Sequence, residues 1–159
     1  MPEKLLILGG TREAYELAEC LVDRYPPRQL TVISSLAGIT GNPKVPAGQV
    51  RIGGFADTYD EGAKSGQNSI LGLRKYLLQE KITFLVNATH PYATRISENA
   101  LAVATELGLP YLRLTRPAWL KHTGDQWIEV PDLAAAAEYL KSESIDTNSR
   151  ISKQIVFLT

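Results

Sequence analysis

The sequence reads ITFLVNATHPYATRISENA over residues 82–100, and this stretch decides the fold. Residues 82–86 form an apolar run with the length and branching of a buried strand, and apolar side chains recur at helical spacing over residues 93–107. The strand therefore leads through Thr89-His90-Pro91-Tyr92 directly into a helix. In an open parallel sheet, such a junction lies at the carboxyl edge, where ligands bind. We interpret residues 89–92 as a candidate site because they bring an imidazole, a hydroxyl and a phenol to that edge.

The rest of the sequence alternates strand-like and helix-like segments that are separated by turns. Residues 53–69 are polar and have no hydrophobic period, which predicts a long loop, and Gly108 is a candidate helix cap. Strands are expected at residues 4–8, 30–34, 50–52, 82–86, 111–114, 127–130 and 154–158, and helices at 12–24, 71–79, 93–107 and 131–141. This alternation predicts an α/β fold with a Rossmann-like, doubly wound parallel sheet.

The last expected strand has no helix after it. It follows a linker-like segment, residues 142–153, and the sequence ends at Thr159. We therefore expect residues 1–141 to form a Rossmann-like nucleotide- and substrate-binding domain. Residues 154–159 would be the first strand of a truncated second domain.

Composition excludes several classes of protein. Lys and Arg number 17, as do Asp and Glu, so no net charge favours nucleic acid or a membrane surface. A single cysteine excludes an internal disulfide and a cysteine-rich metal site. No apolar stretch reaches the roughly 18 residues of a membrane span, and an expected strand starts at Lys4, which leaves no room for a signal peptide. We expect a cytoplasmic protein of 159 residues with a packed core, since 44% of its residues are hydrophobic.

A glycine turn follows the first expected strand. Gly9 and Gly10 stand where a dinucleotide-binding fold places its phosphate loop, and Ala14 is small enough for close packing of helix and strand. Thr11 replaces the usual middle glycine, and its hydroxyl could donate a hydrogen bond to a pyrophosphate instead. Glu13 in the first helical turn opposes phosphate binding by charge. The turn is therefore either a nucleotide site or a plain turn of an α/β fold.

The second expected strand ends in Ser34-Ser35, whereas a site that prefers NAD carries an acid there. If a dinucleotide binds, the missing acid and the nearby Arg12 favour a 2′-phosphate and hence NADP. The alternative is that the two serines merely end a strand.

His90 is the candidate acid or base, because imidazole exchanges protons near neutral pH. The alternative is a histidine that caps the following helix or binds a buried carbonyl. No second His or Cys and no carboxylate stands at metal-ligand spacing, so no metal site is expected.

Residues 111–119, YLRLTRPAW, contain two arginines at and beyond a strand end. Arg113 and Arg116 suit bidentate contacts with carboxylates, and Trp119 suits a flat apolar ligand. A solvated strand edge with a packed tryptophan is the alternative interpretation.

Together these segments resemble the precorrin-6A reductase family of cobalamin biosynthesis, which includes the cobalt-precorrin-6A reductases. The matching stretches are LGGTREA (8–14), SLAG (35–38) with Thr40, GGF (53–55), ATHPYA (88–93) and PYLRLTRPAW (110–119). The resemblance implies two Rossmann-like domains with the ligands between them. It also implies reduction of one double bond of a corrin precursor, precorrin-6A or its cobalt form, by NADPH. Whether the substrate carries cobalt stays open.

The resemblance also implies site residues. Cofactor contacts are expected from Gly9, Gly10, Thr11, Arg12, Ser34, Ser35, Gly38, Thr40, Gly53, Gly54 and Thr89. Substrate contacts are expected from His90, Tyr92, Arg95, Arg113, Arg116 and Trp119, because precorrins carry many carboxylates around a flat ring. His90 and Tyr92 are the catalytic candidates, with His90 as proton donor or as a residue that positions the nicotinamide or a carboxylate.

The sequence departs from the family pattern in three places. Ile39 stands where the family often carries Arg, residues 56–70 look like an insertion, and the sequence ends where the family begins its second domain. The competing function is therefore a non-catalytic NADP-binding module. An exposed cleft face would favour a homodimer.

Overall fold

All sheet neighbours run parallel in the computed structural model, which describes residues 2–38, 45–55, 65–116 and 120–144. In chain order the elements are β1 (Glu3–Leu8), α1 (Arg12–Arg24), β2 (Leu30–Leu36), β3 (Gln49–Ile52), α2 (Ser65–Gln79), β4 (Phe84–Asn87), α3 (Thr94–Leu107), β5 (Tyr111–Arg113) and α4 (Leu133–Ser144). The described strands form one sheet in the order β3-β2-β1-β4-β5. The predicted doubly wound α/β fold is confirmed.

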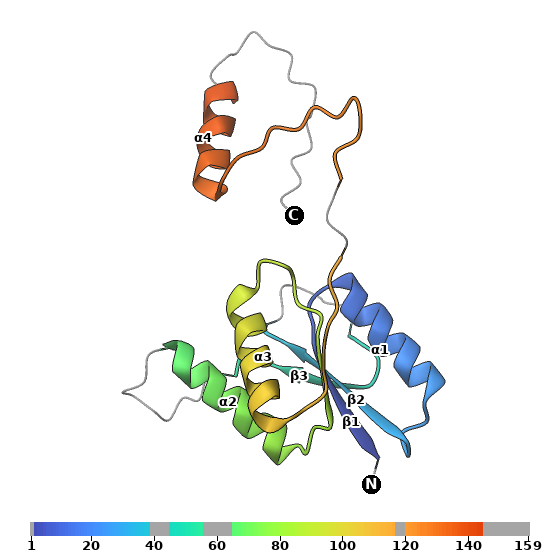
Figure 1. Cartoon of the computed structure of the whole chain (residues 1–159). Coiled ribbons are helices and arrows are strands. Elements are labelled where there is room, and N and C mark those ends of the chain that lie inside the picture. The colour runs from blue at the N-terminus through green and yellow to red at the C-terminus, as the bar shows by residue number, and fades with distance from the viewer. Residues whose placement is uncertain (1, 39–44, 56–64, 117–119, 145–159) are drawn as a thin grey trace. The chain divides into compact units, whose positions relative to one another are not determined.

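The strand order reverses between β1 and β4. The chain adds β2 and β3 on one side of β1, then crosses back and adds β4 and β5 on the other side (Figure 1). In register, Leu8 of β1 lies opposite Ser35 of β2 on one side and Asn87 of β4 on the other. The turns that follow these three residues therefore meet at the carboxyl edge, and such a reversal point is where open α/β sheets bind ligands.

Both faces of the sheet are covered, α1 lying on one face and α2 and α3 on the other (Figure 1). Successive residues of β1 point to opposite faces. Leu5 and Ile7 pack in the cluster beneath α1, whereas Leu6 and Leu8 pack in the cluster beneath α2 and α3. All four are buried, because a doubly covered parallel strand has no solvated face.

The helices that flank the site agree with the sequence pattern. Helix α1 has the predicted bounds, and α3 begins one residue later than expected, with Ala93 as its N-cap. Gly108 ends α3 in the left-handed conformation at φ 63°, so the predicted cap is confirmed.

Helix α2 starts at Ser65, six residues before the predicted start at Leu71. The predicted loop over 53–69 is therefore wrong for residues 65–69, and residues 56–64 lie outside the described part. Gly66 is a poor helix former, which hides the first turn from the pattern. Packing of Leu73 and Leu77, both fully buried, stabilises the helix.

The chain divides into two compact units, residues 1–116 and 117–159. In the second unit, Asp132 Oδ1 accepts the N–H of Ala135 at 2.8 Å at the start of α4, as expected for a helix that follows Pro131. The helix runs to Ser144, three residues into the predicted linker. The predicted strand at 127–130 is wrong, because the described residues 120–144 contain no strand with which it could pair.

Residues 145–159, with the predicted strand at 154–158, lie outside the described part. The domain boundary at residue 141 and the second domain stay predictions. Among the helices that the structure describes, none has the length and apolar character that crossing a membrane requires.

Candidate functional site

The glycine turn after β1 packs tightly on one side and is open on the other. A Cβ at Gly9 would lie 3.4 Å from Cβ of Ala14 and 3.5 Å from Cδ2 of Leu36, so the turn is pressed against α1 and β2. Gly10 has φ +113°, and a Cβ there would meet nothing within 4 Å. Ala14 is buried, as close packing of helix and strand predicted. The open side of Gly10 leaves its backbone accessible to a ligand.

Thr11 joins this turn to the end of β4. As the N-cap of α1 its Oγ1 accepts the N–H of Ala14 at 3.3 Å, and it donates to the carbonyl of Ala88 at 2.7 Å. The hydroxyl proton is therefore already used within the protein, rather than free for a pyrophosphate as the sequence suggested. The amides of Arg12 and Glu13 lie in the first helical turn and have no intrahelical acceptor. The amide of Arg12 is a donor that an anion would meet there, whereas the amide of Glu13 also faces its own carboxylate.

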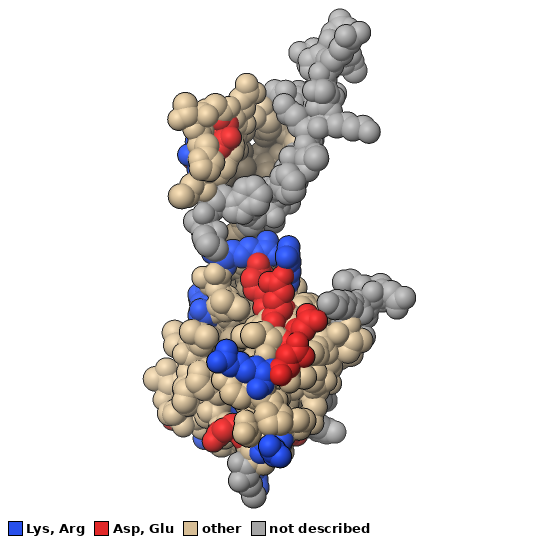
Figure 2. Space-filling view, turned by 90° about the vertical axis from the view of Figure 1, so that its right-hand side faces the viewer, with Lys and Arg blue, Asp and Glu red and all other residues tan. Residues whose placement is uncertain are grey.

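The charged side chains at this end of α1 form ion pairs. Arg12 Nε lies 2.7 Å from Glu16 Oε1, and Arg116 Nε lies 2.5 Å from Glu13 Oε1. Figure 2 shows acidic and basic side chains next to each other on the face that α1 covers. The hydrogen bond from Arg116 lowers the pKa of Glu13 from its ordinary value and raises that of Arg116.

These pairs change two expectations. Arg116 lies beside the glycine turn and offsets the charge of Glu13, which weakens the argument that Glu13 repels a phosphate. Arg12, expected near the 2′-phosphate, is instead paired with Glu16 on the exposed surface of the helix.

The ends of β2 and β3 bring together Ser34, Ser35 and a residue that sequence reasoning missed, Arg51. Both serines are buried, and Ser34 Oγ has no hydrogen-bond partner among the described residues. Arg51 lies opposite Ser35 in register, and its Nη1 donates to Ser35 Oγ at 3.1 Å. The only sequence signal for Arg51 is its place two residues before the Gly53-Gly54 pair.

Arg51 also holds the glycine turn after β3. Its Nη1 donates to the carbonyl of Gly53 at 2.5 Å and its Nη2 to that of Gly54 at 2.6 Å. Its Cζ lies 3.9 Å from the ring centroid of Phe55 and 5.0 Å from that of Tyr76. Burial lowers the pKa of Arg51 and raises that of Tyr76.

A partly buried hydrogen-bond network fixes the end of β4. Asn87 Nδ2 donates to the hydroxyl of Tyr111 at 3.1 Å, while its Oδ1 accepts both the hydroxyl of Thr89 at 2.8 Å and the amide of Thr89 at 3.2 Å. The hydroxyl of Ser97 lies 3.5 Å from that of Thr89 and donates to the carbonyl of Ala93 at 2.9 Å. Thr89, an expected cofactor contact, therefore has a structural role in shaping the loop that carries His90.

His90 and Tyr92 are exposed and adjacent, with ring centroids 5.2 Å apart. His90 Nδ1 accepts the N–H of Tyr92 at 3.4 Å, which places the proton of the neutral imidazole on Nε2. The N-cap of α3 is Ala93, with no side-chain cap, so the alternative that His90 caps this helix is wrong. Both rings are accessible to a ligand, since 68% of Tyr92 is exposed.

The remaining expected residues divide into those that the structure places and those that it does not describe. Arg95 in the first turn of α3 and Arg113 at the end of β5 are exposed at the same edge as His90. Gly38 follows β2 in open space. Thr40 and Trp119 lie outside the described residues.

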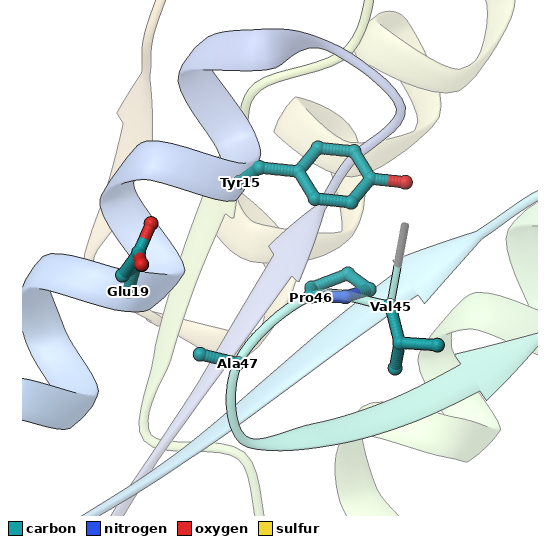
Figure 3. Close-up of a pocket in the computed structure, with 5 residues that line it drawn as sticks. All are labelled: Tyr15, Glu19, Val45, Pro46 and Ala47. Carbon is teal, nitrogen blue, oxygen red and sulfur yellow. The ribbon is translucent and has the colours of Figure 1, made fainter. Parts of the chain in front are cut away.

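A small hollow on the flank of α1 is separate from these residues. Tyr15 and Glu19 of α1 and the segment Val45, Pro46 and Ala47 line it, as Figure 3 shows. Its volume of about 150 Å³ is below the several hundred Å³ typical of small-molecule sites. We therefore place the candidate site at the carboxyl edge. Within the described ranges, no three or more His, Cys, Asp or Glu side chains lie close enough together to hold a metal ion.

The chain is similar to known proteins over most of its length. The model of the precorrin-6x reductase CbiJ/CobK family matches residues 4–159. A precorrin-6A reductase of Rhodobacter capsulatus is 36% identical over 151 residues, which cover 95% of this chain and 54% of the relative. A precorrin-6A reductase of Mycobacterium tuberculosis is 43% identical over 133 residues, 84% of this chain and 47% of the relative.

A solved structure of a CobK precorrin-6A reductase is also similar. It superposes with a TM-score of 0.71 at 38% identity, covering 86% of this chain and 48% of the other. The chain thus spans about half the length of the relatives it matches. Because the family model matches residues 4–159, the chain belongs to the precorrin-6x reductase CbiJ/CobK family.

Proposed function

We propose that the chain is the nucleotide-binding part of an NADPH-dependent reductase that acts on a corrin precursor, precorrin-6A or its cobalt form. The proposal rests on two loops that lie side by side at the carboxyl edge, where the strand order reverses. There, the open glycine turn at Gly10 lies next to the loop that presents His90 and Tyr92, and Thr11 ties the two together. Membership of the family supplies the substrate class, and the relatives named precorrin-6A reductase cover most of this chain.

The residues at the edge fit a dinucleotide. The open backbone at Gly10 and the amide of Arg12 would hold the pyrophosphate. The ends of β2 and β3, with Ser35 and Gly54, would hold the adenosine half, because that half lies over these strands in Rossmann-like folds. When bound, NADPH supplies the hydride.

The substrate side lies over β4 and β5. Tyr92 offers an exposed ring to a flat macrocycle, and Arg95 and Arg113 offer guanidinium groups to its carboxylates. Reduction of a carbon–carbon double bond also requires a proton, and His90 is the candidate donor or positioning residue. Arg116 is a weaker candidate for substrate contact, since it is engaged by Glu13.

Calorimetric titration of the chain with NADPH and with NADH tests the cofactor assignment. We expect NADPH to bind more tightly by about tenfold to hundredfold, as one charge-assisted contact to the 2′-phosphate would give. Equal affinities, or no binding of either, would contradict the proposal.

The competing function is a nucleotide-binding module without turnover. The open turn at Gly10 would serve such a module as well as it would serve a reductase, and the precorrin-6A reductase of Rhodobacter capsulatus provides the reference for turnover. Reduction of precorrin-6A by this chain, assayed beside that relative, separates the two. A comparable turnover number supports a reductase within these residues, and nucleotide binding without turnover supports the module. Sedimentation of the same sample tests the expected homodimer.

A further inference from the structure

Arg51 is held in one place by neighbours on several sides. Its guanidinium donates to Ser35 Oγ and to the carbonyls of Gly53 and Gly54, and it stacks over the ring of Phe55 at 3.9 Å. Three of its five N–H groups are used in these contacts. One N–H of Nη2 and that of Nε have no hydrogen bond to any residue that the structure describes. The group is therefore fixed in orientation and still has donors for an anion.

No carboxylate of the residues that the structure describes balances the charge of Arg51. Within the described ranges, no Asp or Glu oxygen lies within 4.0 Å of its guanidinium. Arg12, which was expected near the cofactor, and Arg116, which was expected near the substrate, each have a glutamate partner at 2.7 Å or less. A partly buried cation without an acidic partner favours an anionic ligand.

The position of Arg51 suits one particular anion. It lies opposite Ser35, the residue with which β2 ends its pairing to β1. In Rossmann-like folds the adenosine ribose lies beside the end of β2, where an acid selects the 2′-hydroxyl of NAD and an arginine nearby accommodates the 2′-phosphate of NADP. Here two serines replace the acid, and Arg51 reaches the same point from β3.

We infer that Arg51 binds the 2′-phosphate of NADPH and is the residue that sets the preference for NADPH over NADH. The carbonyls of Gly53 and Gly54 and the ring of Phe55 hold its guanidinium in place before the cofactor arrives, which reduces the entropy lost on binding. The assignment replaces Arg12, and it rests on the proposed function, because it assumes that the edge binds a dinucleotide.

The test compares two probes that differ only by this phosphate, adenosine 2′,5′-bisphosphate and adenosine 5′-monophosphate. Calorimetry gives the affinity of each for the wild-type chain and for Arg51→Gln. We expect Arg51→Gln to weaken the bisphosphate by about tenfold to hundredfold and to leave the monophosphate nearly unchanged. Arg74→Gln, which removes an arginine paired with Glu106 away from this edge, is the matched control and should change neither affinity.

Three results would overturn the inference but not the proposed function. The preference for the bisphosphate could survive in Arg51→Gln, or both probes could weaken equally, as loss of the turn at Gly53 would produce. A larger loss of preference in Arg12→Ala would also overturn it. If the wild-type chain binds neither probe, the proposed function itself fails.

Arg51→Lys keeps the test valid if the glutamine variant does not fold. Lysine retains the charge but lacks the planar, rigid set of donors with which the guanidinium reaches two carbonyls while it stacks on Phe55. We expect Arg51→Lys to reduce the ratio of bisphosphate affinity to monophosphate affinity by at least about threefold. An unchanged ratio would overturn the inference.

Discussion

Replacing Thr11 by valine tests the connection between the cofactor turn and the loop that carries His90. The substitution keeps the shape of the side chain and removes the hydroxyl, which caps α1 through the N–H of Ala14 and donates to the carbonyl of Ala88 at 2.7 Å. Loss of an N-cap costs about 1 kcal/mol of unfolding free energy, and loss of the second hydrogen bond costs about 1 kcal/mol more, because the buried carbonyl then has no partner. We expect Thr11→Val to lower the free energy of unfolding by about 2 kcal/mol.

Urea denaturation followed by circular dichroism measures this difference. Thr11→Ser is the matched control, since it retains the hydroxyl and both bonds, and we expect it to stay within about 0.5 kcal/mol of the wild type. The reasoning is refuted if Thr11→Val is as stable as the wild type, or if the serine variant loses as much stability as the valine variant.

Three further predictions follow from the site and its surroundings. Gly48→Ala should destabilise the chain more than Gly10→Ala, because both have positive φ but only a Cβ at position 48 would meet a backbone carbonyl, at 2.7 Å; equal midpoints in urea would contradict this. Glu13→Gln should be less stable than the wild type above about pH 4.3, the ordinary pKa of Glu. The hydrogen bond from Arg116 lowers the pKa of Glu13 in the folded state, so this difference in stability should vanish as the pH falls through that lowered pKa. A difference that persists in acid would show that this bond does not stabilise the fold. His90→Ala should slow reduction by about a hundredfold or more if His90 donates the proton, with little change in NADPH affinity measured by calorimetry; normal turnover would exclude that role.

Much of the fold follows from local patterns in the sequence. Apolar runs bounded by turns locate β1, β2 and β4, and apolar spacing with a terminal glycine locates α3 and its end at Gly108. The resulting alternation of strands and helices is enough to predict a parallel, doubly wound sheet. These elements were predictable because each is stabilised by its own hydrophobic face and its own cap.

The errors arose where stability depends on distant partners. The first turn of α2 contains Gly66, and its helical state depends on packing farther along the helix, so the sequence predicts a loop there. The mostly apolar residues 127–130 resemble a strand, but a strand also needs a neighbour for its hydrogen bonds.

The contacts of the charged residues at the site also depend on residues that are distant in the sequence, so local patterns do not predict them. Arg116 was expected to face a substrate, yet it pairs with Glu13, which lies 103 positions earlier in the chain. Arg51 was missed because its importance depends on the register that places it opposite Ser35. Neither contact leaves a local signal, whereas the exposure of His90 and Tyr92 follows from their place in a loop at the strand end.

The most direct test of the account is a nitrogen-15 NMR titration of the chain with NADPH, because it locates the nucleotide without requiring turnover. We predict that the amide shifts that change most belong to the carboxyl edge, with Gly10, Gly54 and His90 among them. Changes centred on the opposite edge of the sheet, near Lys81 and Gly108, or no changes at millimolar NADPH, would contradict the assignment of the site.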